Sequence, residues 1–490
     1  MVRIVLHYYL LKNGFGELMQ LAPVQNSAVL EKGSDLPPEA RLFIIRLFVI
    51  HGASVSFSGT VKSLVKECDS DDRAVRKGMD YLKQAGLITQ VRDSSGKTLY
   101  QVSGFIQQYI VSRSPAGSPP PPLHEQIYAV LFPEHGDNPE RVKRGGFSRA
   151  SRYLLAVMLA HSDALGMVTG VSNAELRKLT GMTEQRLRGQ IKNLLDSSIL
   201  CGYMPGFNGR AVLGKVKSEF SLWLPHAVFG ACSSRYGSIE YVEDRLSKSD
   251  RNEISVIDKM YSLANLKSLE RIKVNIARPA FFGVHFSVEE INSVIDECGG
   301  DYLRWAVLAV ASHLIREGEF FIEAGELFTV FEILLDSPRK VKPYELKVCS
   351  FIACRFMNEK AGYRFDESDM GGFNSGSLQL RFKVALFICR ASLMLASRVN
   401  RALDLVRESR PDFCFLMLMK SRGDYTVRNF SIQFFNSEYM ITPSPSHSLK
   451  IFASGGHLDS GEKAGREIEL FEVSEGVSKL LVSRLDDFSM

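Results

Sequence analysis

The residues best suited to chemistry in this sequence are basic side chains spaced like one face of a helix. A first group lies within residues 72–85 and consists of Arg73, Arg76, Lys77 and Lys83. Apolar residues at helical spacing separate them, so the basic side chains share the outward face of the expected helix. On an exposed helix, Arg and Lys donate hydrogen bonds to phosphate oxygens and to guanine O6 and N7.

A second group follows about a hundred residues later, within residues 184–197, and adds amide side chains: Gln185, Arg186, Arg188, Lys192 and Asn193. Gln and Asn can pair with adenine, so this group has side chains suited to guanine and side chains suited to adenine. Further basic candidates lie near expected hairpins or ahead of the second group: Arg92, Lys97, Arg144 and Arg210. For any one arginine, a phosphate contact is expected more often than a base contact.

The elements around the first group predict a small helical unit with a hairpin. Pro37 and Pro38 open a helix that runs through His51. A short strand is expected at residues 55–57, and Ser58 is expected to cap a second helix. A turn at 69–71 leads into the helix at 72–85, and Gly86 suits the left-handed position after its end. Strands at 87–92 and 98–102 form the hairpin.

The second group has the same layout. Ser148 or Ser151 starts a helix through His161, a short strand follows at 167–169, and residues 172–175 form a capping box. Thr183 caps the helix at 184–197. Strands at 199–204 and 211–222 flank a turn at 205–210.

The passage Arg73–Ile88, RAVRKGMDYLKQAGLI, resembles the recognition-helix-to-wing passage of winged helix-turn-helix domains in many bacterial regulators. The resemblance covers about residues 37–103, and a second copy covers about residues 148–223. It implies a mainly α fold with small β-wings, and double-stranded DNA as the partner of the third helix of each unit. Winged helices also serve as protein-contact modules, so a structural role for one or both units stays open.

The distribution of charge agrees with a polyanionic partner for the N-terminal half. The whole chain of 490 residues has a net charge of +5, of which residues 1–230 carry +8 and the remainder −3. Local positive charge favours phosphate contacts. The 8 cysteines contain no C-x-x-C pair, which argues against a zinc ribbon and a disulfide scaffold. No apolar stretch is long enough and free enough of charge to span a bilayer, so a cytoplasmic protein with no membrane contact is expected.

Composition and breaks in the pattern predict the domain organisation. A Pro-rich stretch at 112–123, SRSPAGSPPPPL, is an extended linker between the two units. The predicted segments are an N-terminal segment 1–36, winged helix domains at 37–111 and 124–229, a mainly helical domain 239–441, a flexible segment 442–466 and an amphipathic segment 467–490.

The C-terminal half predicts packed helices and no chemistry. A capping box at 287–290 opens a helix toward Cys298, and further helices are expected at 301–317, 344–358 and 378–408, with strands at 413–419 and 429–435. The sequence has no phosphate-binding loop, dinucleotide fingerprint, metalloprotease motif or nucleophile elbow. We therefore expect no enzyme activity, no cofactor and no metal site.

These observations predict a sequence-specific DNA-binding protein, a transcriptional regulator whose helical C-terminal half forms homo-oligomers, senses a signal or binds a protein partner. Two alternatives remain open at this point. One is a replication initiator of a plasmid or mobile element, since several such initiators have tandem winged helices. The other is a structural or chromosome-organising protein that uses its winged helices for protein contacts.

Overall fold

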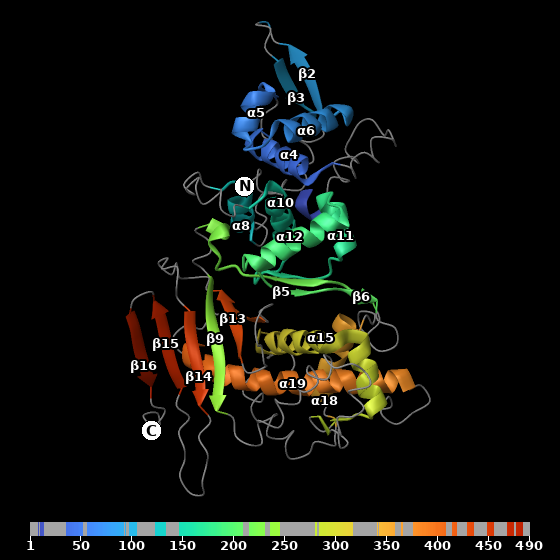
Figure 1. Cartoon of the computed structure of the whole chain (residues 1–490), viewed down its shortest axis with the longest axis vertical. Helices are drawn as coiled ribbons and strands as arrows, with labels where there is room; N and C mark the ends of the chain where they lie inside the picture. The colour runs from blue at the N-terminus through green and yellow to red at the C-terminus, as the bar shows by residue number, and fades with distance from the viewer. Residues whose placement is uncertain are drawn as a thin grey trace, which may run out of the picture. The chain divides into compact units, whose positions relative to one another are not determined.

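In the computed structural model, the residues that the structure describes form two compact bodies. The N-terminal body comprises residues 1–200 and 219–233, and the C-terminal body residues 201–218 and 234–490. The described residues are 8, 10–13, 36–51, 56–92, 94, 98–104, 123–133, 147–208, 215–230, 236–245, 280–281, 284–316, 341, 343–357, 364–365, 376–407, 414–418, 429–435, 448–454, 468–474 and 477–483. The fold is mainly helical with two small antiparallel three-stranded sheets (Figure 1), as the sequence predicted.

Residues 36–104, called module 1 below, contain three helices and a three-stranded sheet. The elements are α4 (Pro38–His51), β1 (Ser56–Ser58), α5 (Val61–Glu67), α6 (Asp72–Gln84), β2 (Ile88–Arg92) and β3 (Thr98–Val102). The sheet is antiparallel in the order β1-β3-β2. This order of elements is the predicted one and is consistent with a winged-helix unit.

Of the two capping predictions for module 1, the one at Gly86 is confirmed and the one at Ser58 is wrong. Asp71 caps α6 by accepting from the Ala74 amide, and Gly86 has a φ of 65° in the left-handed region. The prediction that Ser58 caps the second helix was wrong. Ser58 pairs with Leu99 in the sheet, because the strand ends one residue later than the predicted strand at 55–57, and Thr60 is the cap of α5.

Residues 147–224, called module 2, repeat this layout. The elements are α10 (Arg149–Ala160), β4 (Met167–Val168), α11 (Asn173–Thr180), α12 (Glu184–Asp196), β5 (Leu200–Met204) and β8 (Glu219–Leu222). The sheet order is β4-β8-β5. Between β5 and β8, β6 (Phe207–Asn208) pairs with β7 (Lys215–Val216) in the region where the sequence predicted a wing.

Side-chain caps fix the helix starts of module 2. Of the two serines considered for the start of the first helix, Ser148 is the cap of α10. The capping box between Ser172 and Glu175 is present at α11, and Thr183 caps α12. An additional helix, α8 (His124–Leu131), precedes the module and packs against α10. The sequence did not predict α8.

The first helices of the two modules, α4 and α10, pack against each other within the N-terminal body. Both are almost completely buried along their length. Close packing also occurs inside module 1, where a Cβ atom at Gly78 of α6 would lie 2.5 Å from the Phe43 ring of α4. Glycine at this position lets α6 approach α4, so the outward face of α6 is the one left to solvent.

The described residues of the C-terminal body form three long helices: α15 (Val288–Arg316), α18 (Pro343–Phe356) and α19 (Gly376–Arg407). Both α15 and α18 pack against α19. The two helices expected at 287–298 and 301–317 form the single helix α15. Its buried residues continue on both sides of the glycine pair at 299–300, so packing outweighs the helix cost of the glycines.

The C-terminal body also contains a six-stranded sheet, of which the sequence predicted two strands. Its strands are β9 (Tyr236–Arg245), β12 (Cys414–Leu418), β13 (Asn429–Phe435), β14 (Ser448–Ser454), β15 (Ile468–Ser474) and β16 (Val477–Ser483). The order is β12-β13-β9-β14-β15-β16, and β9 pairs with β14 in parallel. A short hairpin, β10 (Ala280–Phe281) with β11 (Val284–His285), precedes α15.

Arg390, which interrupts an apolar run of the sequence, is buried in α19. Its Nε donates to Glu345 Oε1 of α18 at 2.7 Å, and the two side chains are 3% and 0% exposed. The charged pair is thus part of the packing between these helices. Among the described residues, no helix is both long enough and apolar enough to cross a membrane.

Candidate nucleic-acid interface

The third helix of module 1, α6, presents basic side chains to solvent. Arg73, Arg76 and Lys77 are exposed, while Val75 and Met79 on the opposite face are buried. Asp72, one turn before Arg76, accepts from its Nε at 2.6 Å. Both partners are more than half exposed, so this pair contributes little to stability and a phosphate oxygen can replace the carboxylate.

The other predicted DNA-contacting residues of module 1, Lys83 and Arg92, lie apart from the N-terminal half of α6. The Lys83 ammonium lies over the Tyr100 ring of β3, 5.5 Å from its centre. Arg92 is exposed at the end of β2. Lys97, Arg144 and Arg210 lie outside the described residues.

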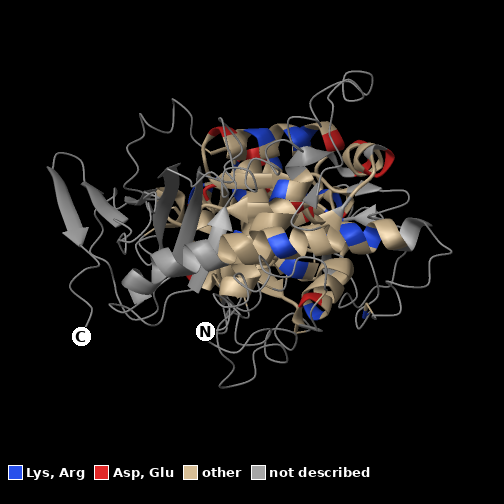
Figure 2. Ribbon diagram, turned by 90° about the horizontal axis from the view of Figure 1, so that it is seen from below, with Lys and Arg blue, Asp and Glu red and all other residues tan. Residues whose placement is uncertain are grey.

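The third helix of module 2, α12, presents a similar face. Gln185, Arg188, Lys192 and Asn193 are exposed. Arg188 pairs with Glu184 one turn earlier, as Arg76 does with Asp72 in α6. Figure 2 shows that basic and acidic residues are interspersed along the described helices. The two third helices therefore carry donors for phosphate and bases, accompanied by carboxylates at their first turns.

Arg186 differs from the other candidates on α12 because it points at module 1. Its Nη2 donates to Glu39 Oε1 in the first turn of α4, and the Arg186 side chain is 38% exposed. The sequence placed Arg186 with the outward residues. In the structure it also joins the third helix of module 2 to the first helix of module 1.

Two arginines of α4 that sequence reasoning did not single out are buried and hold the body together. Arg41 donates from Nε to the Leu36 carbonyl at 2.8 Å and from Nη1 to the carbonyls of Lys178 and Leu179 at 3.0 and 2.8 Å. The last two carbonyls belong to the C-terminal turn of α11. Arg41 of module 1 therefore caps a helix of module 2, where a cation is favoured by the helix dipole.

Arg46, one turn and a half later, caps α8 in the same way. Its Nε donates to the Leu131 carbonyl at 2.6 Å, and its Nη1 donates to the Cys68 and Asp69 carbonyls at 2.9 and 2.7 Å. Burial lowers the pKa of Arg46, against the opposing effect of the Asp69 carboxylate. Burial also raises the pKa of the adjacent Cys68 thiol to about 12, so this thiol is protonated at neutral pH.

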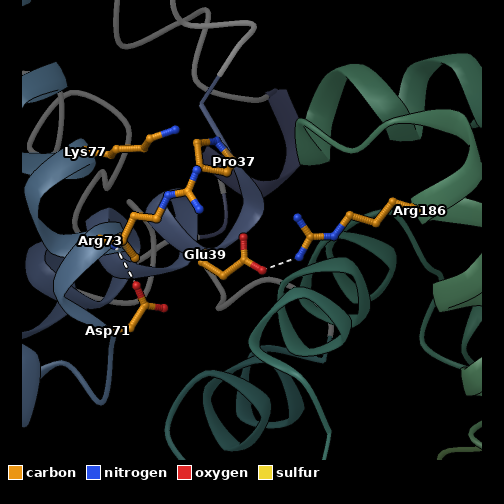
Figure 3. Close-up of a pocket in the computed structure, with 7 residues that line it drawn as sticks. Pro37, Glu39, Asp71, Arg73, Lys77 and Arg186 are labelled. Carbon is orange, nitrogen blue, oxygen red and sulfur yellow. Dashed lines mark hydrogen bonds and ion pairs between the residues drawn. The ribbon is translucent and has the colours of Figure 1, made fainter.

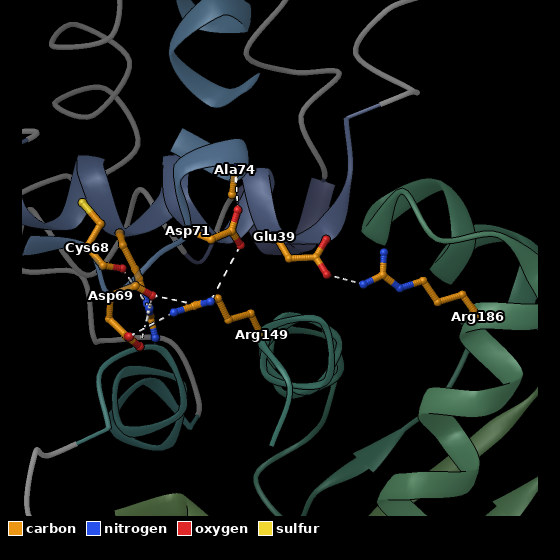
Figure 4. A network of polar contacts seen from close by, with 8 residues as sticks. Glu39, Cys68, Asp69, Asp71, Ala74, Arg149 and Arg186 are labelled. Atoms are coloured by element: carbon orange, nitrogen blue, oxygen red, sulfur yellow. Dashed lines mark hydrogen bonds and ion pairs between the residues drawn. The ribbon is translucent and has the colours of Figure 1, made fainter. Parts of the chain in front are cut away.

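Module 2 sends an arginine back to module 1. Arg149, the first residue of α10, donates from Nε to the Asp69 carbonyl at 2.9 Å, and its guanidinium lies 3.7 Å from Asp71 Oδ2 (Figure 4). The first helix of module 1 thus provides an arginine to the end of the second helix of module 2, and the first helix of module 2 provides one to the turn before the third helix of module 1. These contacts join the two modules within the N-terminal body.

The signal for these contacts in the sequence is weak but present. Arg41 and Arg46 stand in a helix that is otherwise apolar around its circumference, a setting in which an arginine must find buried acceptors. Their acceptors are backbone carbonyls distant in sequence, which no spacing pattern reveals.

Within the part of the chain that the structure describes, no cluster of three or more His, Cys, Asp or Glu side chains is arranged to hold a metal ion. Comparisons of the chain with protein-family models, curated proteins and solved structures found no match.

Proposed function

We propose that modules 1 and 2 are two winged helix-turn-helix domains that together bind double-stranded DNA, with α6 and α12 as the recognition helices. A helix of this size fits the major groove. The proposal rests on the observation that both modules have the same kind of exposed surface on their third helix. Each module leaves the outward face of its third helix to exposed Arg, Lys, Gln or Asn side chains.

The packing between the modules supports the use of both helices on one stretch of DNA. Arg41, Arg149 and Arg186 each cross from one module to the other. A body built in this way presents α6 and α12 in one fixed relation, which favours recognition of a site of defined length. We propose a transcriptional regulator that acts in the cytoplasm, whose C-terminal body forms homo-oligomers, senses a signal or binds a protein partner.

The test is a selection of enriched sites from random-sequence duplex DNA with the full chain, at about physiological salt. Two double variants remove outward cations from each module: Arg76→Ala/Arg92→Ala and Arg188→Ala/Lys192→Ala. The matched control is Lys62→Ala/Lys66→Ala, which removes two exposed cations from α5 instead.

An enriched sequence motif that either α6- or α12-side variant loses, and the control keeps, is the expected result. An equal loss in the control would mean that net charge alone drives binding. Failure of the wild type to bind duplex at low and physiological salt would refute the proposal. Several repeated sites within one origin, rather than a site near a promoter, would identify a replication initiator instead of a regulator.

A further inference from the structure

A cavity of about 320 Å³ lies where the two modules meet in the N-terminal body (Figure 3). Its lining residues come from the starts of three helices and from both modules: Pro37, Glu39, Asp71, Arg73, Ala74, Lys77 and Arg186. Five of the seven residues are charged. A cavity with this lining is suited to a charged ligand and not to an apolar one.

The acidic side chains of the cavity already have partners. Asp71 accepts from the Ala74 amide at 2.8 Å and faces Arg149 on its other oxygen, while Glu39 accepts from Arg186. In contrast, Arg73 and Lys77 form no ion pair with any described residue, although both are exposed and extend over the cavity in Figure 3. Two cationic groups are therefore left for a ligand.

We propose that this cavity holds one backbone phosphate of bound DNA, which Arg73 and Lys77 of module 1 contact beside Arg186 of module 2. The inference rests on the proposed function and assigns a site within it. A phosphodiester carries a single negative charge and two oxygens that accept hydrogen bonds from a guanidinium and an ammonium. The lining contains no aromatic side chain on which a base could stack, so the backbone and not a base occupies the cavity.

The site gives Glu39 a positioning role. Its carboxylate holds the Arg186 guanidinium at the wall of the cavity, so that the cation of module 2 lies beside the cations of module 1. A phosphate bound there would contact the third helices of both modules at once. DNA binding would then be coupled to the packing between the modules.

The experiment replaces single phosphates in the duplex with uncharged methylphosphonates and measures the dissociation constant at each position. The full-length wild type is compared with Arg73→Gln/Lys77→Gln. The matched control is Lys62→Gln/Lys66→Gln, which removes two exposed cations from α5 of the same module without changing the lining of the cavity. Circular dichroism checks that each variant is folded, as expected for exposed residues.

One methylphosphonate position should weaken wild-type binding about tenfold or more, and the same position should have no effect in Arg73→Gln/Lys77→Gln while it keeps its effect in the control. The slope of log binding constant against log salt should fall by about one in the cavity variant, the value for one phosphate contact.

An identical methylphosphonate profile in the wild type and the cavity variant would overturn the phosphate site and leave the proposed function intact. Absence of binding to any duplex would overturn both. A calorimetric titration with inorganic phosphate tests whether the ligand is a free anion instead. Saturation of the wild type at micromolar phosphate, lost in the cavity variant, would overturn the assignment of the site to DNA.

Discussion

Gly181 lies against Arg41, because the turn between α11 and α12 meets the start of α4 at this point. A Cβ atom at Gly181 would be 2.8 Å from Arg41 Nε and closer still to the Leu36 carbonyl, and the glycine has a φ of 69°. Both the backbone conformation and the approach of the two modules therefore require glycine here.

We expect Gly181→Ala to lower the free energy of unfolding of the N-terminal body by about 3 kcal/mol, of which 1–2 kcal/mol is the cost of a left-handed residue and the rest is steric. Gly170→Ala is the matched control, since Gly170 has a φ of 75° and no atom within 4 Å of the added Cβ. It should lose only about 1–2 kcal/mol. Equal losses in the two variants would contradict the tight contact between the modules.

The chain has two tryptophans, which allow this measurement on the full protein. Trp223 belongs to the N-terminal body and Trp305 to α15 of the C-terminal body. In a Trp305→Phe background, urea unfolding followed by fluorescence reports the N-terminal body. The same variant without further change is the reference.

Gly189, in the middle of α12, tests whether that helix enters a groove of DNA. It is exposed and an added Cβ would contact nothing, so Gly189→Ala should raise the stability of the N-terminal body by about 0.5–1 kcal/mol. The new methyl group lies on the outward face beside Arg188. We expect binding to the selected DNA site to weaken at the same time, measured by fluorescence anisotropy. Unchanged affinity would place the middle of α12 away from the DNA.

The buried pair Arg390–Glu345 predicts a characteristic pattern of single and double substitutions. Arg390→Met alone should destabilise the C-terminal body by about 3–5 kcal/mol, because it leaves the Glu345 carboxylate buried without its cation. Arg390→Met/Glu345→Leu should recover most of this loss, since the apolar pair has no charge to desolvate. Urea unfolding of a Trp223→Phe background, read through Trp305, measures both. Additive losses in the double variant would refute the prediction.

Two histidines make the stability of the N-terminal body depend on pH. Burial, and then the charge of Lys12, lowers the pKa of His161 below 6.5, and burial lowers the pKa of His226, whose Nδ1 accepts from the Val228 amide. The unfolded chain therefore takes up protons first as the pH falls below 6.5. The stabilising contribution is complete above this pH and is lost as the pH falls toward the lower folded pKa values.

We expect the urea midpoint reported by Trp223 to fall between pH 7 and pH 5.5, and to fall less in His161→Gln/His226→Gln. His124→Gln, in the same body, serves as the control. A midpoint independent of pH over this range in the wild type would show that neither histidine is held neutral by the fold.

Local signals in the sequence determined most of the elements of the N-terminal body. The capping residues Ser148, Ser172 and Thr183 and the glycine after α6 act on their own neighbours in the chain, so their spacing reveals helix ends directly. The misplaced cap at Ser58 has the opposite cause. Its pairing with Leu99 depends on a strand forty residues away, and a serine two residues ahead of the true cap carries the same local signal.

By itself, the sequence determined the two repeated units and the outward faces of their third helices, because helical period and side-chain polarity are local properties. Tertiary structure alone decided that Arg186 pairs with Glu39, that Arg41 and Arg46 cap helices elsewhere in the body, and that Arg73, Lys77 and Arg186 line one cavity. Each of these contacts joins residues far apart in the chain. The packing of α4 against α10 brings the partners together, and the spacing of residues along the sequence does not reveal which helices pack against each other.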